Sequence, residues 1–125
     1  GMDDKINLAL SGDREERMAL AMDGNRAVHP HLLRNAKLSI EEVAFMARLP
    51  SLNPIVLAKI AESSTYTQNL QIAKALVYNP KTPMTSALRL LDRLPSSELA
   101  ILAKRTSVNL RLATAAKDKL MRRKA

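Results

Sequence analysis

The two histidines are the residues whose type first suggests metal chemistry. His29 and His31 flank Pro30. Zinc-binding helices place two histidines four residues apart so that both rings lie on one face, whereas residues two apart do not share a helix face. No acidic residue or cysteine stands beside them to complete a ligand set. We therefore expect no metal or other cofactor, and interpret the segment as a solvated loop between helices.

Two pairs of carboxylates could in principle perform acid–base chemistry. Glu15-Glu16 and Glu41-Glu42 each fall in the first turn of an expected helix, where negative charge is favoured by the helix dipole, so we interpret them as capping residues rather than catalysts. The three glycines are isolated, and the chain has no cysteine. These absences exclude a glycine-rich phosphate loop, thiolate catalysis and cysteine-ligated metals. With no nucleophile–base pair, the sequence predicts a protein that is not an enzyme.

A basic cluster near the C-terminus is the feature with the most functional content. The last 22 residues hold eight of the 20 lysines and arginines but one acidic residue, Asp118, so seven of the eight net positive charges lie there. The candidate patch for an anionic partner comprises Lys104, Arg105, Arg111, Lys117, Lys119, Arg122 and Arg123. Such a patch would attract phosphates without sequence preference.

Three interpretations of this cluster stand beside one another. It lacks aromatic residues for base stacking and any known reader motif, which weighs against a dedicated nucleic-acid site. Positive charge also suits the end of a helix and the solvated end cap of a helical array. The alternatives are therefore a solvated cap, a nucleic-acid surface, and a surface for an acidic protein or an anionic membrane.

The overall composition is that of one ordered domain. The chain has 125 residues, of which 46% are hydrophobic and 26% are charged, but it has three aromatic residues. A core of this size must therefore be aliphatic. No apolar run is long enough to span a membrane, the first residues are acidic, and cysteine is absent. We expect a cytoplasmic protein. Gly1 before Met2 is typical of a residue left by tag removal.

Apolar spacing and start signals predict helices throughout. Asp13 with Glu16, and Ser39 with Glu42, have the spacing of capping boxes. Asn53-Pro54 has the cap-and-proline pattern of a helix start. The other expected breaks are Ser11-Gly12, Asp23-Gly24-Asn25 (as a left-handed stop), Ser63-Ser64-Thr65 with Thr65 as a cap, Asn79 to Pro83, Pro95-Ser96-Ser97, and Thr106-Ser107. The second helix after Asn79 is expected to bury Met84, Ala87, Leu88 and Leu91.

Two sets of landmarks recur with a similar period. Proposed second-helix starts are Pro30, Pro54, Pro83 and Val108, and the last alanines of the first helices are Ala21, Ala47, Ala75 and Ala103. Both sets are about 24–29 residues apart, as in stacked helical repeats. The sequence predicts an all-α fold: a short α-solenoid, right- or left-handed, of about four two-helix repeats. A short helix at Lys5–Leu10 would cap it, in one domain over residues 2–125 with units near 13–37, 38–62, 63–94 and 95–122.

The third unit carries a resemblance to a known family. Its run Ala75-Leu76-Val77-Tyr78-Asn79-Pro80-Lys81-Thr82-Pro83, followed by Leu88 and Leu91, resembles the bacterial leucine-rich repeat variant, which is related in style to HEAT-like repeats. Asn53-Pro54 and Asn25 through Pro30 are degenerate versions of this motif, and the fourth unit lacks its prolines, so over residues 13–120 the resemblance rests mainly on spacing. The resemblance implies an all-helical array used for binding, and it implies no catalytic residues.

Two functions follow as expectations. The first is a non-enzymatic adaptor that presents a solenoid surface to a protein or peptide. The second is a nucleic-acid-binding module that uses the basic C-terminal helix. An array with two open ends is also compatible with a homodimer.

Overall fold

The computed structural model describes residues 1–124, and Ala125, the last residue of the predicted domain, lies outside the described residues. Most of the described residues are in helices, and none of them is in a strand. Its elements are α1 (Met2–Ser11), α2 (Arg14–Ala21), η1 (Arg26–Val28), α3 (His29–Leu32), α4 (Ile40–Ala47), α5 (Pro54–Glu62), α6 (Ser64–Thr67), α7 (Leu70–Tyr78), α8 (Met84–Leu90), η2 (Leu91–Arg93), α9 (Ser96–Ala103) and α10 (Leu110–Lys124). The prediction of an all-α fold is confirmed.

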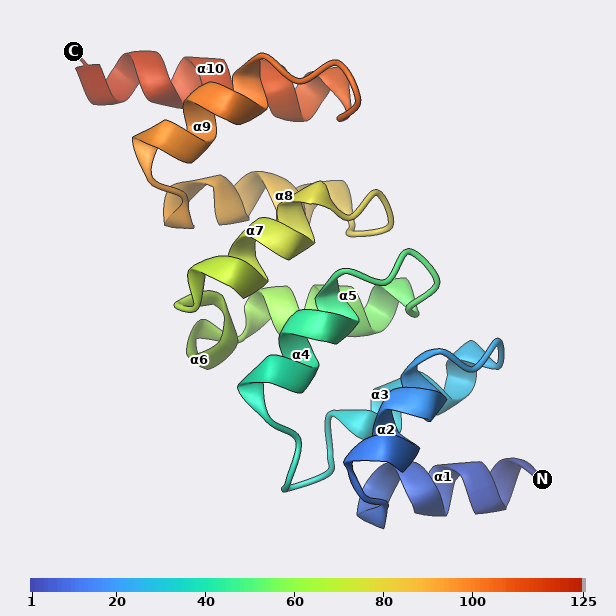
Figure 1. Cartoon of the computed structure of the whole chain (residues 1–125). Coiled ribbons are helices and arrows are strands. Elements are labelled where there is room, and N and C mark those ends of the chain that lie inside the picture. The colour runs from blue at the N-terminus through green and yellow to red at the C-terminus, as the bar shows by residue number, and fades with distance from the viewer. Residues whose placement is uncertain (125) are drawn as a thin grey trace.

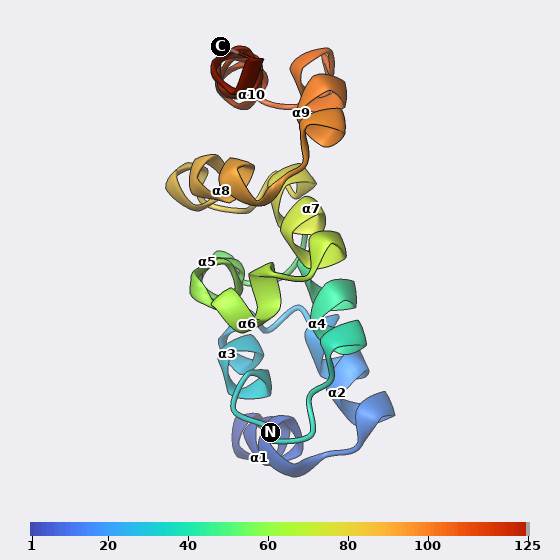
Figure 2. The same ribbon diagram turned by 90° about the vertical axis from the view of Figure 1, so that its left-hand side faces the viewer.

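The helices lie in two layers that run from the N-terminus at one end to the C-terminus at the other. Figure 2 shows α1, α3, α5, α8 and α10 in one layer and α2, α4, α7 and α9 in the other. Figure 1 shows that helices within each layer lie one above the next in chain order. Neighbours in the first layer contact each other along its whole length, and α4 contacts both α2 and α7 in the second. We call the second layer, α2, α4, α7 and α9, the A layer.

The predicted caps at three helix starts are confirmed. Asp13 accepts from the backbone N–H of Glu16, and Ser39 accepts from that of Glu42, each with the reciprocal bond of a capping box. Asn53 accepts from the N–H of Ile55 at the start of α5. Side-chain caps satisfy backbone donors that have no partner inside the helix, which is why these starts could be read from local sequence.

Other boundaries differ from the prediction. The last helix begins at Leu110, and Asn109, not Thr106-Ser107 or Val108, accepts a bond from its first turn. Ser63, not Thr65, caps the one-turn helix α6, and Asn69 caps α7. The stop after α2 needs no left-handed residue, because no described glycine or other residue has positive φ. Asn, Ser and Thr compete for cap positions within a few residues, so spacing alone did not decide between them.

The aliphatic core runs between the two layers as one cluster. In α8 the fully buried residues are Ala87 and Leu90, whereas Met84 and Leu88 remain partly exposed. Leu91, which follows α8, is buried as expected. The expected face of the helix after Asn79 is therefore partly correct, with Leu90 buried in place of Leu88.

Two buried asparagines connect non-adjacent segments with the same bonding pattern. Asn79 donates to the carbonyls of Ala47 and Leu49 at 2.8 and 3.0 Å, and its Oδ1 accepts from the N–H of Lys81. Asn35 likewise donates to two carbonyls near the end of α1 and accepts from the residue two further on. Each side chain thereby satisfies carbonyls left free at the end of another helix.

Candidate binding surface

The outer face of the A layer is built from positions that recur in its four helices. The seventh residue after each N-cap is apolar and buried: Leu20, Met46, Leu76 and Leu102. The sixth and ninth residues after the same caps are exposed or half-buried: Ala19, Phe45, Ala75 and Ile101, and Met22, Arg48, Tyr78 and Lys104. The seventh position is apolar in all four helices, while the sixth and ninth positions differ from helix to helix. The buried fourth position is not uniform, since it holds Arg17 in α2 and Val43, Ala73 and Leu99 in the other helices. We call this surface the A face.

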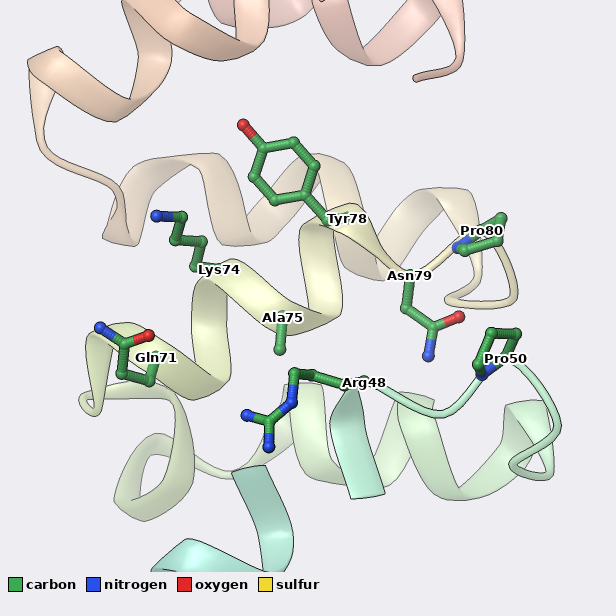
Figure 3. Close-up of a pocket in the computed structure, with 8 residues that line it drawn as sticks. All are labelled: Arg48, Pro50, Gln71, Lys74, Ala75, Tyr78, Asn79 and Pro80. Carbon is green, nitrogen blue, oxygen red and sulfur yellow. The ribbon is translucent and has the colours of Figure 1, made fainter. Parts of the chain in front are cut away.

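A hollow of about 430 Å³ lies on the A face between α4 and α7. Arg48 follows α4, and Gln71, Lys74, Ala75 and Tyr78 lie along one side of α7. Figure 3 shows Arg48 extending along one side of the hollow below Ala75 and Lys74 projecting from the other side. The hollow therefore combines an apolar floor with two cations from different helices, and none of its lining residues is acidic.

Tyr78 stands at one edge of the hollow. Its ring projects to the side opposite Arg48 (Figure 3), and the guanidinium carbon of Arg105 lies 5.2 Å from the ring centroid. A guanidinium at this distance from an aromatic ring is attracted by the ring quadrupole. The contact joins Arg105, from the segment after α9, to α7 and occupies one face of the ring; Arg105 itself does not line the hollow.

The cations at the hollow differ in their partners. Lys74 Nζ lies 3.3 Å from Glu98 Oε1, which joins α7 to α9. Within the part of the chain that the structure describes, no acidic side chain pairs with Arg48. Glu98 therefore offsets Lys74, while Arg48 at the hollow and Arg105 over Tyr78 have no acidic partner within the described residues.

The seven basic residues predicted as one patch take different places in the structure. Lys104 and Lys117 line a hollow between α9 and α10, together with Lys124. Lys119 pairs with Asp92, and Arg123 donates to the Leu94 carbonyl at 2.7 Å. Arg105 lies over Tyr78, while Arg111 and Arg122 are exposed on α10. The structure brings Lys104 and Lys117 together, and it directs Lys119 and Arg123 back onto the chain.

The interpretation of His29 as part of a solvated loop is wrong. Its side chain is fully buried, Nε2 donates to the Asp23 carbonyl at 2.9 Å, and Nδ1 accepts from the Asn53 N–H at 3.0 Å. Burial lowers the pKa of His29 below its usual 6.5. Among the described residues no cluster of three histidine, cysteine or acidic side chains is arranged to hold a metal. His29 is therefore a structural residue that links the segment after α2 to the start of α5.

The carboxylates of the capping boxes have an unexpected partner. Glu42 caps α4 as predicted, but it also forms a buried ion pair with Arg17 of α2. The Arg17 guanidinium lowers the pKa of Glu42 from 4.5 to about 2. A permanently charged, paired carboxylate is suited to structure rather than to proton transfer.

Sequence reasoning missed the hollow, although part of its signal was present. Gln71, Lys74, Ala75 and Tyr78 follow the spacing i, i+3, i+4, i+7, which places them on one helix face. That face is opposite the buried residues Ile72, Leu76 and Val77. Ala75 is nevertheless also one of the alanines by which the helix was identified. Arg48 gave no such signal, because packing between α4 and α7 brings it there.

Comparison with known proteins adds no relative: no family model, no curated protein and no solved structure matches the chain. None of the described helices combines the length and apolar character needed to cross a membrane.

Proposed function

We propose that this protein is a short α-solenoid of about four two-helix repeats, of the HEAT-like kind, that acts as a non-enzymatic adaptor. The A face is the surface that it presents to a protein or peptide partner. The repeat assignment, the resemblance to the leucine-rich repeat variant and the binding role are parts of the same proposal.

Recurrent cap positions support the repeats. The A-layer helices follow Asp13, Ser39, Asn69 and Pro95, which are 26, 30 and 26 residues apart. In the other layer, the helical segments η1–α3, α5, α8 and α10 begin after Asn25, Asn53, Pro83 and Asn109, which are 28, 30 and 26 residues apart. These spacings make Asn25 equivalent to Asn53, whereas the proline pattern predicted that Pro30 is equivalent to Pro54.

Burial follows the same register in the facing helices. The fourth and seventh residues after these caps are buried in all four: His29 and Leu32, Leu57 and Ile60, Ala87 and Leu90, and Ala113 and Ala116. Each pair of helices leaves an apolar stripe that the next pair covers, as stacked repeats require.

One observation carries the binding role: on the A face, the sixth and ninth positions after the caps differ in chemistry while the buried seventh position stays apolar. Phe45 and Tyr78, two of the three aromatic residues, lie at such surface positions, as does Arg48. Aromatic residues, methionine and arginine are enriched at protein interfaces. A constant scaffold with a variable face supports recognition of a partner rather than catalysis.

Selection from a random peptide display library tests this function. The outer-face variant changes Phe45, Arg48, Ile101 and Lys104 to serine, and the control changes Ile55, Lys59, Arg89 and Leu110, which lie in the other layer and match them in apolar and cationic character. We expect peptides selected on the wild type to bind the control and not the outer-face variant. Equal binding to both variants, or no selected peptide, would count against the proposal.

Nucleic-acid binding through α10 is the second candidate. The observation that favours it is the grouping of Lys104, Lys117 and Lys124 around one hollow between α9 and α10. Mixed-sequence single- and double-stranded DNA should then bind in fluorescence anisotropy at low salt and release as salt rises. Replacing the three lysines by glutamine should weaken that binding. No binding of wild type at low salt would exclude this candidate.

A further inference from the structure

We propose that the hollow between α4 and α7 is the docking site of an extended, carboxylate-rich peptide segment, with an apolar side chain placed against Ala75 and acidic side chains reaching Arg48, Lys74 and Arg105. This inference rests on the proposed function, for which it names the site and the chemistry of the partner.

Charge complementarity is the first argument. Arg48 and Lys74 border the hollow, and none of the lining residues is acidic. Arg105 does not line the hollow, but it lies over the ring of Tyr78, which does. Glu98, paired with Lys74, offsets one of the three charges. Guanidinium groups bind carboxylates through two parallel hydrogen bonds, and Arg48 has no ionic partner within the described residues. A carboxylate on the partner would supply the charge that this surface lacks.

The shape and polar groups of the hollow favour an extended segment. The hollow has a volume of about 430 Å³, which is within the range of small binding clefts. Ala75 forms its floor, and Pro50 and Pro80 lie at one end. Such a floor takes an apolar side chain, while the Gln71 amide can both donate to and accept from a peptide backbone. Alternation of apolar and acidic residues along an extended chain places them on opposite sides.

The environment of Tyr78 favours peptide over nucleic acid at this site. Single-stranded nucleic acids bind by stacking successive bases on exposed aromatic rings. Tyr78 is the one aromatic residue that lines the hollow, and Arg105 occupies one face of its ring. The hollow thus offers cations and an apolar floor but one aromatic ring, of which one face is already covered, whereas successive bases stack on several rings.

The test uses a fluorescein-labelled peptide, Gly-Ser-Asp-Glu-Leu-Glu-Asp-Gly-Ser, and a matched peptide with lysine at the four acidic positions. We expect the acidic peptide to raise anisotropy with the wild-type protein and the lysine peptide to have no effect. The double variant Arg48→Ala/Arg105→Ala should weaken binding by about tenfold or more. The control Lys59→Ala/Arg89→Ala, which removes two exposed cations from the other layer, should change affinity by less than about twofold. Circular dichroism and thermal unfolding of each variant show that it is folded.

Equal weakening by both double variants would mean attraction to net charge and would overturn the inference. Failure of the acidic peptide to bind, while library-selected peptides bind the A face, would refute this site chemistry and leave the proposed function standing. If neither binds, both fail. A single-stranded oligonucleotide that binds through Arg48 and Arg105 and is not displaced by the acidic peptide would assign the hollow to nucleic acid and overturn the inference.

Discussion

Arg17 of α2 and Glu42 of α4 form a buried, two-pronged ion pair. Arg17 Nε lies 2.7 Å from Glu42 Oε1, Nη2 lies 3.0 Å from Oε2, and the two side chains are 5% and 2% exposed. Arg17 Nη1 also donates to the Gly12 carbonyl, and Glu42 accepts from the Ser39 N–H. The pair therefore connects the cap of α4 to α2 and to the end of α1. Every charged group in it has hydrogen bonds, which buried charges require.

Removing the negative charge of this pair should destabilise the fold. We expect Glu42→Gln to lower the free energy of unfolding at pH 7 by about 3 kcal/mol, because it leaves the Arg17 charge buried and unpaired. Glu41→Gln, one residue away and exposed, is the control and should change it by less than about 0.5 kcal/mol. Urea unfolding followed by circular dichroism measures both. Equal stability of the two variants would contradict the structural role of the pair.

The Glu42 carboxylate should also make the free energy of unfolding depend on pH. Its pKa is about 2 in the folded protein and 4.5 as its ordinary value, so the ionised form favours folding. The contribution is fully present above pH 4.5 and is lost as pH falls towards 2. The difference in unfolding free energy between wild type and Glu42→Gln should therefore shrink across that window.

The buried His29 should make the free energy of unfolding depend on pH in a second, higher range. Since Nε2 donates to a carbonyl and Nδ1 accepts from an N–H, the bonded ring is neutral, and a proton on Nδ1 would oppose the Asn53 N–H. Burial lowers the pKa of His29, so its contribution is present above pH 6.5 and falls as pH drops below it. Asp23 and Arg26 also act on the ring, in opposite directions.

Unfolding measured between pH 7.5 and 5 tests this dependence. We expect the wild type to lose stability below pH 6.5. The variant His29→Leu should lose less over the same range; leucine is the residue at Leu57, which lies four residues after Asn53 as His29 lies four residues after Asn25. His31→Gln keeps His29 and should follow the wild type. An NMR titration in which the His29 ring has a pKa of 6.5 or above would contradict the assignment.

Asn79 should be among the polar residues most sensitive to replacement. It is buried, and its amide donates to two carbonyls at the end of α4. Asn79→Ala leaves both carbonyls and the Lys81 N–H without this partner, at an expected cost of about 2–4 kcal/mol. Asn79→Asp should cost at least as much, because a carboxylate has no donor for the carbonyls. The control is Asn7→Ala on the exposed side of α1, and thermal unfolding that gave equal losses would contradict the bonding described.

Local patterns predicted that the chain is all-helical and where three of its helices start. Capping residues and prolines act on backbone groups within three or four residues, so the helix starts at Asp13, Ser39 and Asn53 could be predicted from local sequence. The pairing of Arg17 with Glu42 crosses 25 residues and depends on how α2 and α4 pack, which no local spacing encodes. The same holds for the hollow: α7 indicated one wall, but Arg48 arrives through the packing of α4. Composition indicated the basic C-terminal cluster. It could not indicate that Lys119 and Arg123 bond to other residues of the chain.

The buried face of α8 gives a direct test of where sequence and structure differ. Apolar spacing predicted that Leu88 is buried between the layers, whereas Leu90 is 4% exposed and Leu88 is partly exposed beside Leu110. Leu90→Ala should therefore lower the free energy of unfolding by about 2–5 kcal/mol, because it leaves a cavity in the core. Leu88→Ala should cost less than about half as much, since neighbouring side chains and water can fill the space. Chemical unfolding of the two variants decides between the two faces: a larger loss for Leu88→Ala would support the predicted face of α8, which shares the buried Ala87 and Leu91 with the observed one.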